Sequence, residues 1–257
     1  MFKLALDAGH YLGTAGKRCP KELDPNETRE WWLNDRVADQ VEFLLAEYDN
    51  VEILRLDDSD DGKSDIALFE RVKRANDWKA DFYLSIHHNA GINGGTGGGI
   101  VAYCYGKGSN ASFEWRDSLY DALITQTGLK GNRAKPKATA NHYVTRYTNM
   151  PAVLIELGFM DSATDVPVIL TDNYSNQCAA AIVEVIVKRN SLVKKREHTA
   201  YTVQINDTYT ETEGKRIVAE LTAKGYSAQL VLNRERSFDA DGTQRICQVA
   251  GSASRPF

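Results

Sequence analysis

The chain has 257 residues, 42% of them hydrophobic and 26% charged, and a formal net charge of −4. This size accommodates one large α/β domain, or a medium domain followed by a small one, with a core that needs no disulfides. The negative net charge, without a basic stripe, argues against a nucleic-acid-binding protein. The four cysteines are widely separated and form no CxxC pair, so we expect free thiols in a reducing compartment.

The N-terminal apolar run, residues 2–6 (FKLAL), is too short for a membrane span and is interrupted at once by Asp7 and His10. It does not have the pattern of a signal peptide either. We therefore expect no membrane insertion and a protein that is cytoplasmic as synthesised. If a leader has been removed, the expected location is extracellular.

Apolar runs and helical patterns alternate along the first 190 residues. Short, mainly apolar runs without helical gaps predict buried strands at 2–6, 51–56, 81–86, 98–105 and 151–155. Apolar side chains at near-helical spacing predict helices at 27–48, 65–79, 111–128 and 175–190. This alternation predicts a layered α/β domain whose mostly parallel sheet is flanked by helices.

The pattern changes near residue 190. Residues 191–200 are charged and poor in apolar side chains, which predicts a linker. The remainder shows a strand at 201–205, a helix at 211–225 and strands at 227–232 and 245–250. We therefore predict a catalytic domain at 1–190, a linker at 191–200 and a small α+β domain at 201–257.

Three expected strands end directly before side chains that can bind a metal or move protons. His10 follows the first strand, His87 and His88 end the third, and Glu156 follows the last. Ligands of such sheets bind beyond the carboxyl ends of the strands, so these residues should converge. A hydrolytic zinc site uses three nitrogen or oxygen ligands, leaves one position open and has a carboxylate nearby.

Alternative interpretations remain for each of these residues. A lone histidine at a strand end is often a hydrogen-bonded structural group, and Glu156 would then form an ion pair with Arg71 or Arg146. Successive strand residues point to opposite faces, so His87 and His88 should not both bind one ion. Periodicity alone does not choose between the two histidines.

Four ordered blocks between residues 4 and 162 resemble the N-acetylmuramoyl-L-alanine amidase family, the zinc-dependent cell-wall amidases of the amidase-3 type. The first two are LDAGHYLGTAG (6–16), similar to a DxGHG turn, and EWWLN (30–34), similar to ExxxN. LFERVKRAN (68–76) with SIHHNA (85–90) forms the third, and MPAVLIELGFMDS (150–162) the fourth. The resemblance implies the fold that these amidases share with zinc carboxypeptidases.

The resemblance also implies a role for individual side chains. Its SIHxNA register assigns His87 to the metal and leaves His88 as a variable neighbour. The full set it implies is one catalytic Zn²⁺ held by His10, Glu30 and His87, with Glu156 as the general acid/base.

Other polar residues lie close to these blocks. Glu22 and Glu27 are alternatives to Glu30, but we interpret them as solvated carboxylates at a helix start. Asn34, one helical turn after Glu30, is expected to orient that carboxylate. Residues near the last strand, interpreted as groove-lining or surface groups, are His142, Tyr143, Arg146 and Tyr147. The glycine-rich stretch 92–99 predicts a loop beside the site rather than a phosphate loop.

The implied activity is cleavage of the amide bond between N-acetylmuramic acid and L-alanine of peptidoglycan. Glu156 would take a proton from water and deliver it to the departing amine. A phage-type endolysin is the favoured setting; a bacterial autolysin or sporulation-associated amidase is the alternative. A catalytically silent wall-binding protein and a zinc peptidase are the other candidates.

The C-terminal segment resembles a truncated SPOR-type peptidoglycan-binding domain. YTVQI (201–205), AELTAKGYSAQLV (219–231) and RICQVAG (245–251) carry this resemblance. It implies wall binding, while a stabilising or homodimer-forming appendage is the alternative.

Overall fold

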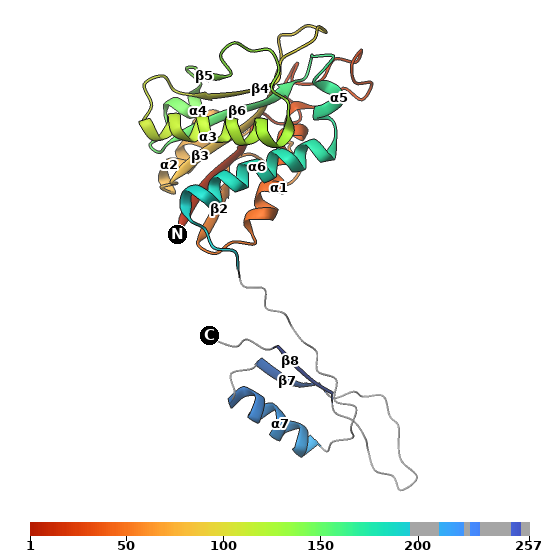
Figure 1. The fold of residues 1–257 in the computed structure, drawn as a ribbon, viewed down its shortest axis with the longest axis vertical. Helices are drawn as coiled ribbons and strands as arrows, with labels where there is room; N and C mark the ends of the chain where they lie inside the picture. Colours follow the sequence, from red (N-terminus) through yellow and green to blue (C-terminus); the bar gives the residue numbers. More distant parts are fainter. Residues whose placement is uncertain (196–210, 224–226, 232–247, 253–257) are drawn as a thin grey trace. The chain divides into compact units, whose positions relative to one another are not determined.

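The computed structural model describes residues 1–195, 211–223, 227–231 and 248–252 (Figure 1). The chain divides into two compact units, Met1–Lys195 and Arg196–Phe257. Backbone hydrogen bonds from Asp49 to Val193 and from Lys195 to Glu47 tie the end of the first unit to the segment before its second strand. Residues 196–200 of the predicted linker lie outside the described residues.

A six-stranded sheet forms the centre of the first unit, in the order β2-β1-β3-β6-β4-β5. Neighbouring strands are parallel except β4 and β6, which are antiparallel. The predicted mostly parallel α/β fold is therefore confirmed. The strands are β1 (Phe2–Ala8), β2 (Val51–Arg55), β3 (Phe82–Asn89), β4 (Ile100–Cys104), β5 (Lys137–Thr139) and β6 (Ala152–Phe159).

Helices cover both faces of this sheet and differ in size between the two faces (Figure 1). The three long helices α1, α3 and α6 pack on one face, where alternate strand residues such as Leu4, Leu84 and Ile155 form the large core. Helices α2 and α4 pack on the other face, over Ala5 and Tyr83. The bounds are α1 (Glu30–Leu45), α2 (Leu68–Asp77), α3 (Asn110–Thr127), α4 (Tyr143–Arg146), α5 (Val166–Ile169) and α6 (Asp172–Asn190).

Local sequence signals explain where two of the long helices begin. The Ser109 side chain accepts a hydrogen bond from the backbone N–H of Ser112 at the start of α3, and Thr171 accepts one from Tyr174 at the start of α6. Such caps satisfy N–H groups that lack a partner within the helix. Within the described residues, no helix combines the length and apolar character that a membrane crossing requires.

The second unit contains α7 (Glu211–Ala223), β7 (Ser227–Val231) and β8 (Gln248–Ser252). The two strands pair in antiparallel fashion. The strand predicted at 201–205 lies outside the described residues, so the SPOR-like topology stays a prediction.

Candidate metal centre

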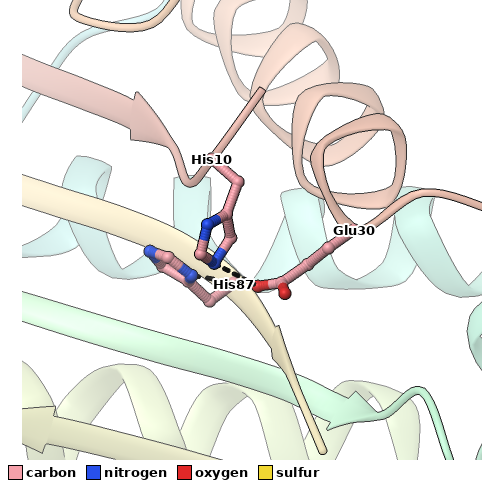
Figure 2. A group of neighbouring side chains, drawn as sticks. All are labelled: His10, Glu30 and His87. Carbon is pink, nitrogen blue, oxygen red and sulfur yellow. Dashed lines mark hydrogen bonds and ion pairs between the residues drawn. The ribbon is translucent and has the colours of Figure 1, made fainter. Parts of the chain in front are cut away.

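Three elements of the first unit bring His10, Glu30 and His87 together (Figure 2). His10 follows β1, Glu30 is the first residue of α1, and His87 lies near the end of β3. Glu30 Oε1 is 3.2 Å from His10 Nε2 and 3.0 Å from His87 Nδ1. One ligand atom from each residue lies within 4.8 Å of the others, so the three side chains are close enough together to hold one metal ion.

The turn that carries His10 lies directly against the His87 ring. His10 has a φ of +70°, a conformation uncommon for residues other than glycine. A Cβ atom at Gly9 would lie 2.1 Å from His87 Cε1, so only glycine allows this approach. The backbone N–H of Gly9 donates to Ile86 O at 2.9 Å, which ties the turn to β3.

Arg71 of α2 holds the same turn from the sheet face on which α2 packs. Its buried guanidinium donates to Asp7 Oδ1 at 2.6 Å, to Ala8 O at 2.9 Å and to His10 O at 2.7 Å. Ser85 donates to the second Asp7 oxygen at 2.6 Å. Burial alone would raise the pKa of Asp7, but the Arg71 charge and these hydrogen bonds keep it lowered. The resulting network fixes the backbone of a candidate ligand.

His88 points away from the cluster, as the pleat predicts. Its side chain is buried, and Nδ1 lies 2.8 Å from Asn34 Oδ1 on α1. Burial lowers the pKa of His88 to about 3, so the ring is neutral at pH 7 and Nδ1–H is the donor. Asn34 Nδ2 donates to Gly9 O at 3.0 Å. The expectation that Asn34 orients Glu30 is therefore wrong: Asn34 anchors His88 and the turn before His10.

Glu30 is fully buried, and its charge is supported by its neighbours. Burial alone would raise the pKa of its carboxyl, but hydrogen bonds from His10 and His87 hold it far below its usual range. Glu30 Oε2 has no hydrogen-bond partner among the described residues, although Lys17 Nζ lies 3.4 Å away. A buried carboxylate with an unsatisfied oxygen beside two imidazoles is a donor set that suits zinc.

Glu156 lies on β6 directly beside His87. The two residues are register partners in the parallel β3–β6 pair, so their side chains leave the same sheet face. Burial raises the pKa of Glu156 to about 7 against the lowering effect of His87. Glu156 Oε2 is buried and has no hydrogen-bond partner within the described residues. The alternative ion pairs with Arg71 and Arg146 are absent from the described part of the chain.

The other polar residues considered from the sequence lie outside the cluster of His10, Glu30 and His87. Glu22 is exposed, and Glu27 forms an ion pair with Arg18 at 3.2 Å, so neither competes with Glu30 for the metal position. The His142 ring lies edge-on against the Tyr103 ring. The pKa of His142 is lowered, mainly by burial and to a smaller extent by the charge of His87. Exposed groups of the short helix α4 and its end are Tyr143, Arg146 and Tyr147.

The structure also adds a residue that the sequence did not connect with the site. Lys17 lies beside Glu30 because the chain returns from the first turn to the start of α1, where the Glu30 N–H donates to Lys17 O at 3.0 Å. No periodicity or spacing in the sequence indicates this contact, since it depends on an irregular loop.

An α/β sheet with two histidines and a glutamate beside its strand ends, and a second buried glutamate alongside, is an arrangement that hydrolases with a catalytic metal use. Comparison with known proteins identifies the family within this class. A sequence profile described as N-acetylmuramoyl-L-alanine amidase matches residues 4–188. The chain belongs to the N-acetylmuramoyl-L-alanine amidase family.

The individual relatives include N-acetylmuramoyl-L-alanine amidases and a phage endolysin. The chain is 31% identical over 236 residues to the N-acetylmuramoyl-L-alanine amidase CwlM of Bacillus licheniformis, covering 91% of this chain and 86% of that protein. It is 28% identical over 190 residues to an endolysin of Bacillus phage SPP1, covering 74% and 66%. The catalytic domain of the amidase CwlV from Bacillus (Paenibacillus) polymyxa superposes with a TM-score of 0.65 at 25% identity, covering 74% and 99%.

Proposed function

We propose that this protein hydrolyses the amide bond between N-acetylmuramic acid and L-alanine in peptidoglycan. Family membership supports the amidase activity and the peptidoglycan substrate. The observation that carries the chemistry is the convergence of His10, Glu30 and His87 beside Glu156.

His10, Glu30 and His87 would hold one zinc ion. When bound, zinc acts as a Lewis acid that polarises the scissile carbonyl and makes water more acidic. Glu30 contributes a negative charge that is already ionised, because the two imidazoles hold its pKa far down despite burial. Arg71 and Asn34 keep the backbone around His10 in place through the bonds described above.

Glu156 moves the proton in this proposal. Its carboxylate accepts a proton from the attacking water and then donates it to the nitrogen of L-alanine as the amide bond breaks. A carboxyl group whose pKa lies near 7 suits both steps, and general acid–base help is typically worth about 10² to 10⁴ in rate. Its unpaired buried oxygen leaves the group free to bond to a reactant.

Digestion of purified peptidoglycan with the zinc-loaded full chain tests this proposal. Mass analysis should show new L-alanine amino termini and intact glycan strands. New reducing sugars, or cuts within the stem peptide, would contradict amidase action. A protein that binds walls but releases nothing would support the silent wall-binding alternative.

Two biological settings remain as proposals. A phage-type endolysin is the one predicted from the sequence, and a phage endolysin is among the relatives. The similarity to a bacterial amidase extends over more of this chain, 91% against 74%, which supports the bacterial autolysin as second candidate. Lysis by the purified protein added to whole cells, compared with expression during growth, distinguishes the two.

A further inference from the structure

An open pocket of about 550 Å³ lies next to the candidate metal centre. Its lining includes Asn89, two residues beyond His87 on β3, and Val101, the register partner of Glu156 on β4. The pocket therefore lies close to the candidate site, although its lining includes none of His10, Glu30, His87 and Glu156. Its volume lies within the range of about 300–1,000 Å³ typical of ligand sites.

Two cationic side chains, Arg133 and Lys135, line this pocket. Both are exposed, and neither forms an ion pair with an acidic residue of the described chain. The Arg133 guanidinium carbon lies 4.4 Å from the ring centroid of Phe159, which is 2% exposed. This cation–π contact holds one positive charge at the pocket wall.

The segment that carries the two cations is locked to the glycine-rich loop. A Cβ atom at Gly131 would lie 2.1 Å from Gly98 O, so the two backbones meet more closely than side chains allow. Asn132 Oδ1 accepts a hydrogen bond from the Gly98 N–H at 3.0 Å, and Asp165 Oδ2 accepts one from Gly99 at 2.7 Å. Close backbone packing therefore fixes the segment that carries Arg133 and Lys135.

We propose that the pocket lined by Arg133 and Lys135 binds a free carboxylate of the peptide stem that departs with L-alanine. This inference rests on the proposed amidase function. The carboxyl group of muramic acid is consumed in the scissile amide, so the sugar side of that bond presents no carboxylate. The peptide side carries carboxyl groups, and an arginine with a neighbouring lysine is suited to bind them.

Two synthetic muramoyl dipeptides test the proposal. Both carry alanine as the second residue, so its α-carboxyl is the only carboxyl of the peptide; this group is a free acid in one compound and a carboxamide in the other. Binding is measured by calorimetry with the full, zinc-loaded chain carrying Glu156→Gln, which prevents turnover. We expect the acid to bind about tenfold or more tightly than the amide, as a charge-assisted hydrogen bond predicts.

The matched variants are R133Q/K135Q and K130Q, each added to the same Glu156→Gln chain. The double variant should reduce the acid-to-amide ratio to about one, whereas Lys130, exposed and outside the pocket lining, should leave the ratio unchanged. A thermal melt monitors folding; if the double variant is unfolded, K135Q alone is used. Equal binding of acid and amide by the parent chain overturns the proposal, and so does a ratio that survives R133Q/K135Q.

This test separates the two proposals. If the chain without Glu156→Gln hydrolyses neither dipeptide nor peptidoglycan, the amidase function fails, but the binding ratio still decides the role of the pocket. If it hydrolyses both dipeptides without preference and the ratio is one, only the pocket assignment fails.

Discussion

Replacing Gly9 with alanine tests how tightly the candidate metal centre is built. The added Cβ would lie 2.1 Å from Cε1 and 2.2 Å from Nε2 of His87, where ordinary contact begins at 3.4 Å. Gly9 is held by Ile86 O through its N–H and by Asn34 through its carbonyl, so the imidazole has to move. The displacement needed is about 1.3 Å, far beyond the roughly 0.2 Å that a metal–ligand distance tolerates.

We expect Gly9→Ala to lower zinc affinity by about 100-fold, the upper end of what losing ligand support costs. Competition with a chromophoric chelator measures this affinity, and circular dichroism checks the fold. The matched control is Gly106→Ala, whose Cβ would meet Thr139 at 3.6 Å, an ordinary contact. Wild-type zinc affinity in a folded Gly9→Ala protein would refute the assignment of His87 as a ligand.

Three further predictions concern single side chains. His87→Ala should lose zinc and activity together. His88→Ala should keep the metal but lose about 2–4 kcal/mol of stability, because it leaves a cavity and an unpaired Asn34 oxygen. Metal analysis and denaturant unfolding distinguish the two variants. Glu156→Gln should retain zinc and lose about 10² to 10⁴ in turnover of peptidoglycan; wild-type rates would contradict its role as acid/base. Arg71→Met should lower the free energy of unfolding by about 3–5 kcal/mol, because Asp7 is left buried without its partner. It should also weaken zinc binding about 10- to 100-fold. Denaturant unfolding measures the first effect and chelator competition the second.

The sheet was predictable because its central strands β1, β3 and β6 are buried on both faces and read as short apolar runs. Five of the six strands described in the first unit were expected, and β5 was not, since its three residues are too few to show a period. The four-residue helices α4 and α5 were missed for the same reason. Helix α1 begins three residues later than the pattern suggests, because Arg29 keeps an extended backbone with ψ of 143°.

The pairing of Glu30 with His87 and of Asn34 with His88 shows where sequence reasoning ended. Glu30 and Asn34 are one helical turn apart on α1, and the pleat of β3 points His87 and His88 to opposite faces. The same helix can therefore contact both histidines. Spacing indicated that Glu30 and Asn34 share a helix face, but the partner of each depends on how α1 crosses the end of β3. That crossing is set by packing between distant segments.

The sequence by itself determined the α/β class and the residues able to do chemistry, because strand burial and strand ends leave local patterns. It also separated His87 from His88 once the resemblance supplied the register. Tertiary structure alone decided that Gly9 must lack a side chain and that Arg71 bonds to Asp7 and His10 rather than to Glu156. It also decided that Arg133 and Lys135 line a pocket close to the candidate metal centre. These features depend on close approaches between segments far apart in the chain, which no local pattern records.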